Sequence, residues 1–143
     1  AAVLIGSDEC GALAQLPPGL PVLRARLVAG PEAAMLAGQP VFAFCGIANP
    51  GKFFATLQDA GAVIAGREAF ADHYPYDAGD LRDLLAQAEA LRAVAVTTKK
   101  DFVRIPPQFR SRVTVVTVGL AWEEPAAIES LLDPLAARVP IPA

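Results

Sequence analysis

Short apolar runs alternate with segments of helical period along most of this chain, and no other feature restricts its fold as strongly. Between the runs, residues 50–61 and 77–92 repeat apolar side chains every three or four positions, as one face of a helix does. Alternating strands and helices predict an α/β fold, namely a three-layer α/β/α Rossmann-like domain with a mostly parallel sheet. The runs that we expect to be strands are residues 1–5, 41–45, 62–65, 93–97 and 113–118.

Weaker patterns predict the remaining elements. Residues 22–28 alternate between two faces, which indicates an edge or connecting strand with one face in water. Residues 31–36 and 126–137 are expected to be helices. Pro125 suits the first turn of the second helix, whereas Pro134 should kink or shorten it.

Proline and glycine gather between residues 11 and 21, which predicts a connector. We therefore expect residues 1–21 to be the remnant of an amino-terminal domain with its connector. Residues 22–143 would then form a carboxyl-terminal α/β domain. The chain starts with Ala1 inside an apolar run, which favours a segment cut from a longer protein.

Composition narrows the class of protein. With 143 residues, 54% of them hydrophobic and 19% charged, the chain is expected to be one globular domain. A net charge of -3 gives no electrostatic reason to expect a nucleic-acid partner. No apolar run approaches the ~20 residues of a membrane-spanning helix, so a soluble chain is expected. Cys10 and Cys45 lack metal-site spacing and are expected to be reduced packing residues, and no metal ligands are predicted.

Residues 46–53 almost spell a phosphate-binding P-loop, which is G-x-x-x-x-G-K followed by Ser or Thr. Phe53 stands where the Mg²⁺-binding hydroxyl belongs, and Pro50 lacks an amide hydrogen that the phosphate cradle uses. The residues fit a helix start better, with Asn49 as N-cap and Pro50 at the first helical position. Such a helix start still has free amides that can bind an anion.

Three loops are expected to meet at the carboxyl edge of the parallel sheet, where ligands of open α/β sheets bind. They are residues 46–51, 70–76 and 97–101. The second holds the only histidine, His73, beside Asp72, and Tyr76 closes it. The pair predicts either an oriented imidazole for acid–base work or a turn histidine bonded to backbone. The third holds Thr98, Lys100 and Asp101, which either grip a phosphate or form a solvated strand exit.

In this order the three loops resemble the carboxyl-terminal half of the tetraacyldisaccharide 4′-kinases, the lipid A 4′-kinases of Gram-negative bacteria. The resemblance covers residues 2–132, and each motif alone is weak. The matching residues are Phe44-Cys45-Gly46-Ile47, Pro50, Lys52-Phe53-Phe54-Ala55-Thr56-Leu57, Asp72-His73, Tyr76 and Thr97-Thr98-x-Lys100-Asp101-x-Val103-Arg104.

The resemblance implies an enzyme that moves the γ-phosphoryl group of ATP onto the 4′-hydroxyl of a lipid A disaccharide precursor, at the cytoplasmic face of the inner membrane. ATP and Mg²⁺ would be bound mainly by an amino-terminal kinase domain, so this chain alone is expected to be inactive. By the same resemblance, His73 reaches across a cleft to the catalytic aspartate, with Asp72 beside it. The expected cleft residues are Gly46, Asn49, Tyr76, Thr98, Lys100 and Asp101.

The chain departs from the family pattern at three positions. Lys99 replaces a usual Glu, Ala48 replaces a usual Gly, and Gly51 stands at a usually acidic or polar position. Two other interpretations stay open. One is a non-catalytic Rossmann-like module that binds an anion or nucleotide at the Gly46 loop. The other is a homologue that lost activity, for which Lys99 is the one indication.

Overall fold

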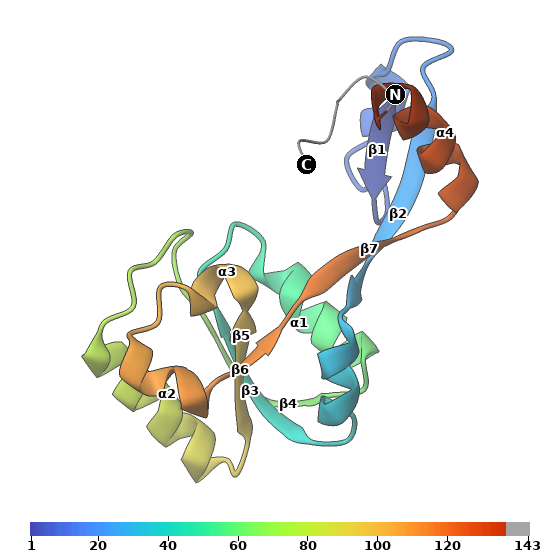
Figure 1. Cartoon of the computed structure of the whole chain (residues 1–143). Coiled ribbons are helices and arrows are strands. Elements are labelled where there is room, and N and C mark those ends of the chain that lie inside the picture. The colour runs from blue at the N-terminus through green and yellow to red at the C-terminus, as the bar shows by residue number, and fades with distance from the viewer. Residues whose placement is uncertain (137–143) are drawn as a thin grey trace, which may run out of the picture. The chain divides into compact units, whose positions relative to one another are not determined.

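The computed structural model describes residues 1–136 of the chain (Figure 1). Helices and strands alternate through most of this range, as the sequence predicts. The elements are β1 (Ala2–Ile5), η1 (Ala12–Gln15), β2 (Val22–Ala29), η2 (Pro31–Leu36), β3 (Pro40–Cys45), α1 (Pro50–Asp59), β4 (Val63–Ala69), α2 (Ala78–Ala90), β5 (Val94–Thr98), α3 (Lys99–Phe102), η3 (Pro107–Arg112), β6 (Thr114–Val116), β7 (Val118–Trp122) and α4 (Pro125–Ala136), where η marks a 3-10 helix.

The chain divides into two compact units. The large unit is Val28–Gly119. The small unit is Ala1–Leu27 with the described part of Leu120–Ala143. The boundary that we expect after residue 21 does not separate these units, because β1 and β2, on either side of it, pair in one sheet. That boundary stays a prediction about the domains of the whole protein.

The large unit contains a four-stranded sheet in the order β4-β3-β5-β6, and every neighbouring pair is parallel. This confirms the predicted α/β fold with its mostly parallel sheet. The prediction of one strand over residues 113–118 is wrong, because β6 ends at Val116 and β7 belongs to another sheet. The break lies at Thr117, whose backbone N–H donates to the Glu32 carboxylate and whose carbonyl accepts from Gly30 N at 2.8 Å.

Side chains of β3 alternate between two cores on opposite faces of this sheet, which gives the three layers. Val41, Ala43 and Cys45 pack with α1 and η2. Phe42 and Phe44 pack with α2. Figure 1 shows α1 and α2 on either side of the sheet. Because both faces of β3 are covered, its sequence reads as a continuous apolar run.

Both long helices of the large unit begin where the sequence predicts. Asn49 caps α1 by accepting from the Lys52 backbone N–H at 3.3 Å, and Pro50 occupies the first turn. Gly61, with φ of 87°, follows the end of α1 in the left-handed conformation that glycine tolerates. Asp77 begins α2 with a reciprocal capping box that it forms with Asp80.

The small unit contains a three-stranded sheet in the order β1-β2-β7, in which β1 and β2 are parallel. Of the two positions expected for residues 22–28, the edge is wrong, since β2 pairs on both sides, whereas the connecting strand agrees with a β2 that continues from the small unit into the large unit. The expected wet face is confirmed, because Leu23 and Ala25 are buried whereas Arg24 and Arg26 are exposed. Helix α4 continues through Pro134 to Ala136, so the expected shortening is not seen.

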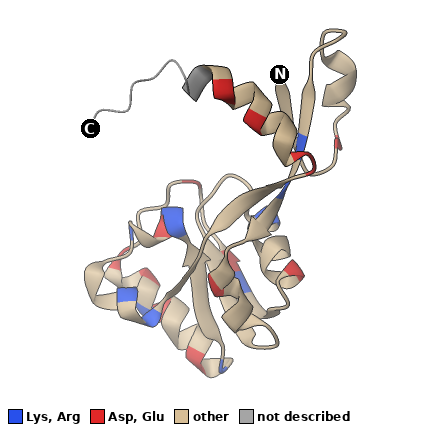
Figure 2. Cartoon of the chain, turned by 45° about the vertical axis from the view of Figure 1, so that its right-hand side comes forward, with Lys and Arg blue, Asp and Glu red and all other residues tan. Residues whose placement is uncertain are grey.

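Charged residues of both signs are interspersed over the large unit (Figure 2). Among residues 1–136, no helix combines the length and the apolar character needed to span a membrane. Both cysteines are free thiols. Cys45 is buried as expected, but Cys10 is exposed, so its expected packing role is wrong.

Candidate functional site

The loops that follow β3, β4 and β5 lie at one edge of the large unit's sheet, as predicted, because these strands are parallel. Backbone hydrogen bonds hold the first two loops together. Phe70 N donates to Cys45 O at 2.9 Å, and His73 N donates to Gly46 O at 3.1 Å. The histidine loop is thus attached to the end of the central strand β3.

His73 occupies a turn with φ of 63°, which side-chain-bearing residues rarely adopt. Its side chain is 67% exposed. The ring Nδ1 lies 2.9 Å from Nη2 of Arg104, and Nε2 lies 3.7 Å from Oδ2 of Asp72. The backbone of His73 is therefore fixed in a turn and bonded to backbone, as one interpretation expects, while its ring stays accessible. The acid–base interpretation stays a prediction.

Asp101 is a carboxylate with 0% exposure in α3, the short helix that directly follows β5. Thr98 donates its hydroxyl to Oδ2 at 2.6 Å, and Arg104 donates Nη1–H to Oδ1 at 3.1 Å. The Asp101 backbone N–H in turn donates to the Thr98 hydroxyl at 3.1 Å. Because a buried charge needs a charged partner and satisfied hydrogen bonds, this arrangement accounts for a fully buried carboxylate.

Two further buried groups lie near the Asp101 carboxylate. The pKa of the Tyr76 hydroxyl is raised far above its ordinary value of 10, mainly by burial and, as the second cause, by the Asp101 charge. The same two causes in the same order raise the pKa of the Cys45 thiol to about 12. Both groups are therefore neutral at physiological pH, which leaves the Asp101–Arg104 pair as the charged element beside them.

The first and second loops are in close contact at Gly46. A Cβ atom at this position would lie 2.9 Å from the Ala71 carbonyl oxygen and 3.0 Å from Cβ of Tyr74. Only glycine therefore lets residues 71–74 close over the end of β3. Gly46 shapes the site through its missing side chain.

The near P-loop at residues 46–53 does not fit ATP or Mg²⁺. Asn49 already accepts from the Lys52 N–H, Pro50 has no N–H, and Phe53 is buried at 2% exposure in the core beneath α1. The residues form the helix start that the sequence favours. Nothing in this loop supplies the hydroxyl that holds the metal in a P-loop.

The predicted site residues fall into three groups. His73, Thr98 and Asp101 are brought together through Arg104, and Tyr76 lies buried beside Asp101. Asp72 and Lys100 are exposed, and Asn49 caps α1. Within residues 1–136 no three His, Cys, Asp or Glu side chains could hold a metal ion together. The roles of the individual site residues stay predictions.

Arg104 belongs to the motif that carries the family resemblance, but it is not among the site residues expected from the sequence. It stands three positions after Asp101, a spacing at which oppositely charged side chains meet within one helical turn. That spacing predicts the ion pair. The contact with His73, which is 31 positions away in the sequence, becomes visible only in the fold.

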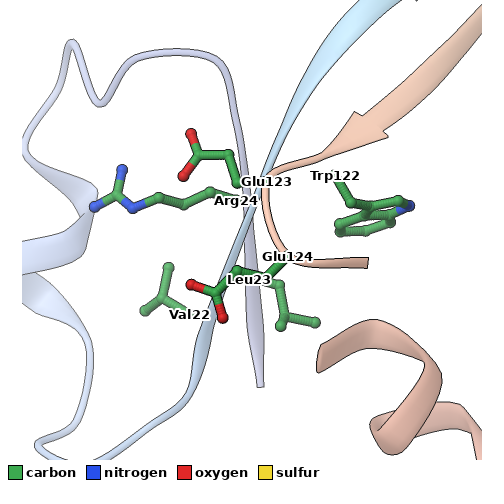
Figure 3. A pocket seen from close by; sticks show the side chains of 6 residues that line it. All are labelled: Val22, Leu23, Arg24, Trp122, Glu123 and Glu124. Atoms are coloured by element: carbon green, nitrogen blue, oxygen red, sulfur yellow. The ribbon is translucent and has the colours of Figure 1, made fainter. Parts of the chain in front are cut away.

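A separate small pocket of about 100 Å³ lies in the small unit (Figure 3). Side chains of β2 and of the segment around the end of β7 line it, and Glu123 N donates to Arg24 O beside it at 3.0 Å. None of the predicted site residues lines this pocket. Its lining residues are Val22, Leu23, Arg24, Trp122, Glu123 and Glu124.

This chain is similar to known proteins of the following family. The model of the tetraacyldisaccharide-1-P 4'-kinase family matches residues 5–136. A tetraacyldisaccharide 4'-kinase of Rhodospirillum rubrum is 51% identical over 139 residues, which are 94% of this chain and 42% of that relative. The same-named protein of Gluconacetobacter diazotrophicus is 52% identical over 133 residues, or 93% of this chain and 41% of the relative.

A third relative of that name, from Paramagnetospirillum magneticum, is 46% identical over 140 residues, or 96% of this chain and 43% of the relative. The chain thus spans about two fifths of the length of these curated relatives. No solved structure was found to match it. Since the family match extends over nearly all of the described residues, this chain belongs to the tetraacyldisaccharide-1-P 4'-kinase family.

Proposed function

We propose that this chain is the carboxyl-terminal part of a kinase that transfers the γ-phosphoryl group of ATP to the 4′-hydroxyl of a tetraacyldisaccharide 1-phosphate precursor of lipid A. The observation that carries the proposal is the family match over residues 5–136, together with relatives of the same name at about half identity. The partners would be this lipid disaccharide, an amino-terminal kinase domain and the cytoplasmic face of the inner membrane.

ATP and Mg²⁺ would be held mainly by the amino-terminal kinase domain, because the Gly46 loop lacks the groups to hold them. Residues 1–21 would belong with that domain, and residues 22–143 would supply the second wall of the cleft. Phosphoryl transfer depends mainly on positioning and on charge stabilisation. The contribution of this chain is therefore an accessible imidazole at a fixed place, supported by the loops around Gly46 and Asp101.

In this proposal His73 acts on the base rather than on ATP. Its ring orients the carboxylate that accepts the proton of the 4′-hydroxyl, and Asp72 lies beside it at 3.7 Å. Tyr76, Thr98 and Asp101 support the loop from inside, while Asn49 and Lys100 line the cleft with their exposed groups. A residue that orients a base raises the rate without binding the nucleotide.

The sharpest test of this role is His73→Asn in the complete kinase. Asparagine tolerates the left-handed backbone found at position 73, so the turn is kept while the imidazole is removed. We expect kcat to fall by about one to three orders of magnitude, because the group that orients the base is lost. Steady-state kinetics with ATP and the lipid disaccharide measures it. Asp83→Ala, at an exposed position on α2, is the matched control and should keep its turnover.

Unchanged turnover in His73→Asn would remove the histidine from the mechanism, and failure of the complete protein to phosphorylate the disaccharide would overturn the function itself.

The rival function is a non-catalytic module that binds an anion or nucleotide at the Gly46 loop. It predicts ATP binding by the 143-residue chain that Lys52→Ala abolishes, which calorimetry measures. The hydrogen bond from Lys52 N to Asn49 argues against it.

A further inference from the structure

We propose that Arg104 is a positioning residue that fixes the ring of His73 in one tautomer and one orientation, with Asp101 as its anchor. The catalytic part of this inference rests on the proposed function. The structural part does not, because it concerns only contacts among residues of the large unit.

The guanidinium of Arg104 lies between the buried carboxylate and the exposed imidazole. Nη1 donates to Oδ1 of Asp101 at 3.1 Å, and Nη2 lies 2.9 Å from Nδ1 of His73. The Arg104 side chain is 21% exposed. The planar guanidinium is thus held by the fully buried Asp101 and in turn restrains the ring of His73, which is 67% exposed.

The direction of the second contact determines the tautomer. A guanidinium has only donors, so Nδ1 of His73 must be the acceptor and carries no proton. In the neutral ring the proton is therefore on Nε2. Oδ2 of Asp72 lies 3.7 Å from Nε2, beyond hydrogen-bond length. The Nε2–H group is thus free of this carboxylate and directed away from Arg104, as a donor for another acceptor.

The anchor keeps the guanidinium in place. Asp101 is fully buried, and the Thr98 hydroxyl satisfies its other oxygen at 2.6 Å, so Arg104 supplies the positive charge that this carboxylate needs. Releasing Arg104 would leave a buried charge unpaired, which is costly. The backbone bond from His73 N to Gly46 O, at 3.1 Å, fixes the other end of the histidine.

An imidazole held in this way is a hydrogen-bond donor. If the proposed function holds, the Nε2–H group orients and polarises the carboxylate that takes the proton of the sugar hydroxyl. The ring does not take that proton itself, since its one unprotonated nitrogen faces a guanidinium. This separates a positioning histidine from a general-base histidine.

The chain has one histidine, so the tautomer can be measured directly. The probe is the 143-residue chain with ¹⁵N-labelled imidazole, observed by long-range ¹H–¹⁵N NMR at neutral pH. We expect a protonated Nε2, and an Nδ1 resonance displaced from that of a free imidazole by the accepted hydrogen bond. Arg104→Lys keeps a positive charge for Asp101, but a single ammonium lacks the fork that spans both acceptors.

In Arg104→Lys we expect the Nδ1 resonance to move to the value of a free imidazole. An unchanged resonance in a folded Arg104→Lys chain would overturn the inference. If that variant does not fold, Asp101→Asn with Arg104→Gln removes both charges together and should cause the same loss of the tautomer restraint. Retention of the displaced Nδ1 resonance in this double variant would also overturn it.

The complete kinase supplies the second readout. Arg104→Lys should lower kcat about tenfold with little change in KM, as expected for lost orientation. When Arg104→Lys is combined with His73→Asn, kcat should fall no further than in His73→Asn, because both changes remove the same orienting function. Additive losses would overturn the catalytic part. A complete protein without kinase activity would instead refute the proposed function, and the NMR result would still decide whether Arg104 positions the ring.

Discussion

The Tyr76 hydroxyl is buried beside the Asp101 carboxylate, and within the described residues it has no hydrogen-bond partner. Its ring packs edge-on against Phe44 at 5.7 Å and against Phe70 at 5.2 Å. The ring therefore stabilises the core, while the unsatisfied hydroxyl costs free energy.

We accordingly expect Tyr76→Phe to raise the free energy of unfolding by about 1 kcal/mol, since it keeps the ring and removes a buried polar atom. Denaturant unfolding measures the change. Tyr74→Phe is the matched control, because it deletes a hydroxyl that is bonded to Asp80 at 3.3 Å and should bring no gain. A clear loss of stability in Tyr76→Phe would indicate a real hydrogen bond to Asp101.

At this scale the sequence predicts which residue types gather but not how they pair. His73, Thr98 and Asp101 could be found because each follows the end of an apolar run that reads as a strand. The contact of Arg104 with His73 could not be predicted, because the two residues are 31 positions apart and meet only when their two loops are folded. The tautomer of His73 can be inferred only once this contact is known.

Helix α2 shows how much of one element is encoded locally. Asp77 accepts from Gly79 N at 2.6 Å and from Asp80 N at 2.9 Å, and Asp80 accepts from Asp77 N at 3.0 Å. All of these groups lie within one turn, and the apolar face follows directly. Local hydrogen bonding and periodicity agree, so both the start and the buried face of α2 were predictable.

Asp77→Ala should lower the free energy of unfolding by about 1 kcal/mol, the usual cost of a lost N-cap. Thermal unfolding followed by circular dichroism measures it. Asp83→Ala removes a carboxylate that is exposed on the same helix and should change stability by less than about 0.5 kcal/mol. Equal effects of the two substitutions would mean that the capping box contributes nothing.

The strand prediction failed over residues 113–118 because the side chains of a segment do not determine with which other segment its backbone forms hydrogen bonds. Residues 113–118 are β-branched throughout and four of the six are valines, yet the backbone at Thr117 bonds to Glu32 and Gly30 instead of continuing the ladder. The pairing of β2 on both sides was missed for the same reason. Strand order depends on contacts between distant segments.

For the molecule as a whole, the two tyrosines and the buried thiol of Cys45 determine the response to alkali. The pKa of Tyr74 is raised mainly by burial and, as the second cause, by the Asp80 charge. Because the pKa of Tyr76 is raised as well, both tyrosines titrate at higher pH in the folded chain than in the unfolded chain. A raised acid pKa leaves stability unchanged below the unfolded value, which is 9 for the thiol and 10 for the tyrosines. Above it, the unfolded state releases protons first, and stability falls as pH rises.

We expect the free energy of unfolding to decrease above pH 9 through Cys45, and more steeply above pH 10, where Tyr76 adds a slope of about 1.4 kcal/mol per pH unit. Unfolding midpoints across this pH range measure the slope. The absorbance of tyrosinate, which only Tyr74 and Tyr76 produce in this chain, should appear later than in the urea-unfolded chain. Tyr76→Phe should reduce the slope above pH 10 and leave the contribution of Cys45, and a slope that this substitution does not change would contradict the shift of Tyr76.

The fold class was predictable at this scale because alternating strands and helices with short connections restrict the topology strongly. The division into two compact units was not. It depends on β2 and β7, which both continue from one unit into the other. No local pattern marks the position along a continuous strand where one unit ends.

The different surroundings of the two thiols have a practical consequence. Cys45 has a pKa of about 12 and no exposed surface, whereas Cys10 is exposed in the small unit. Alkylating reagents attack thiolates that solvent can reach. A fluorophore carried by a maleimide would therefore attach at a single defined point without mutagenesis, far along the sequence from the imidazole, and its emission could report when another polypeptide docks.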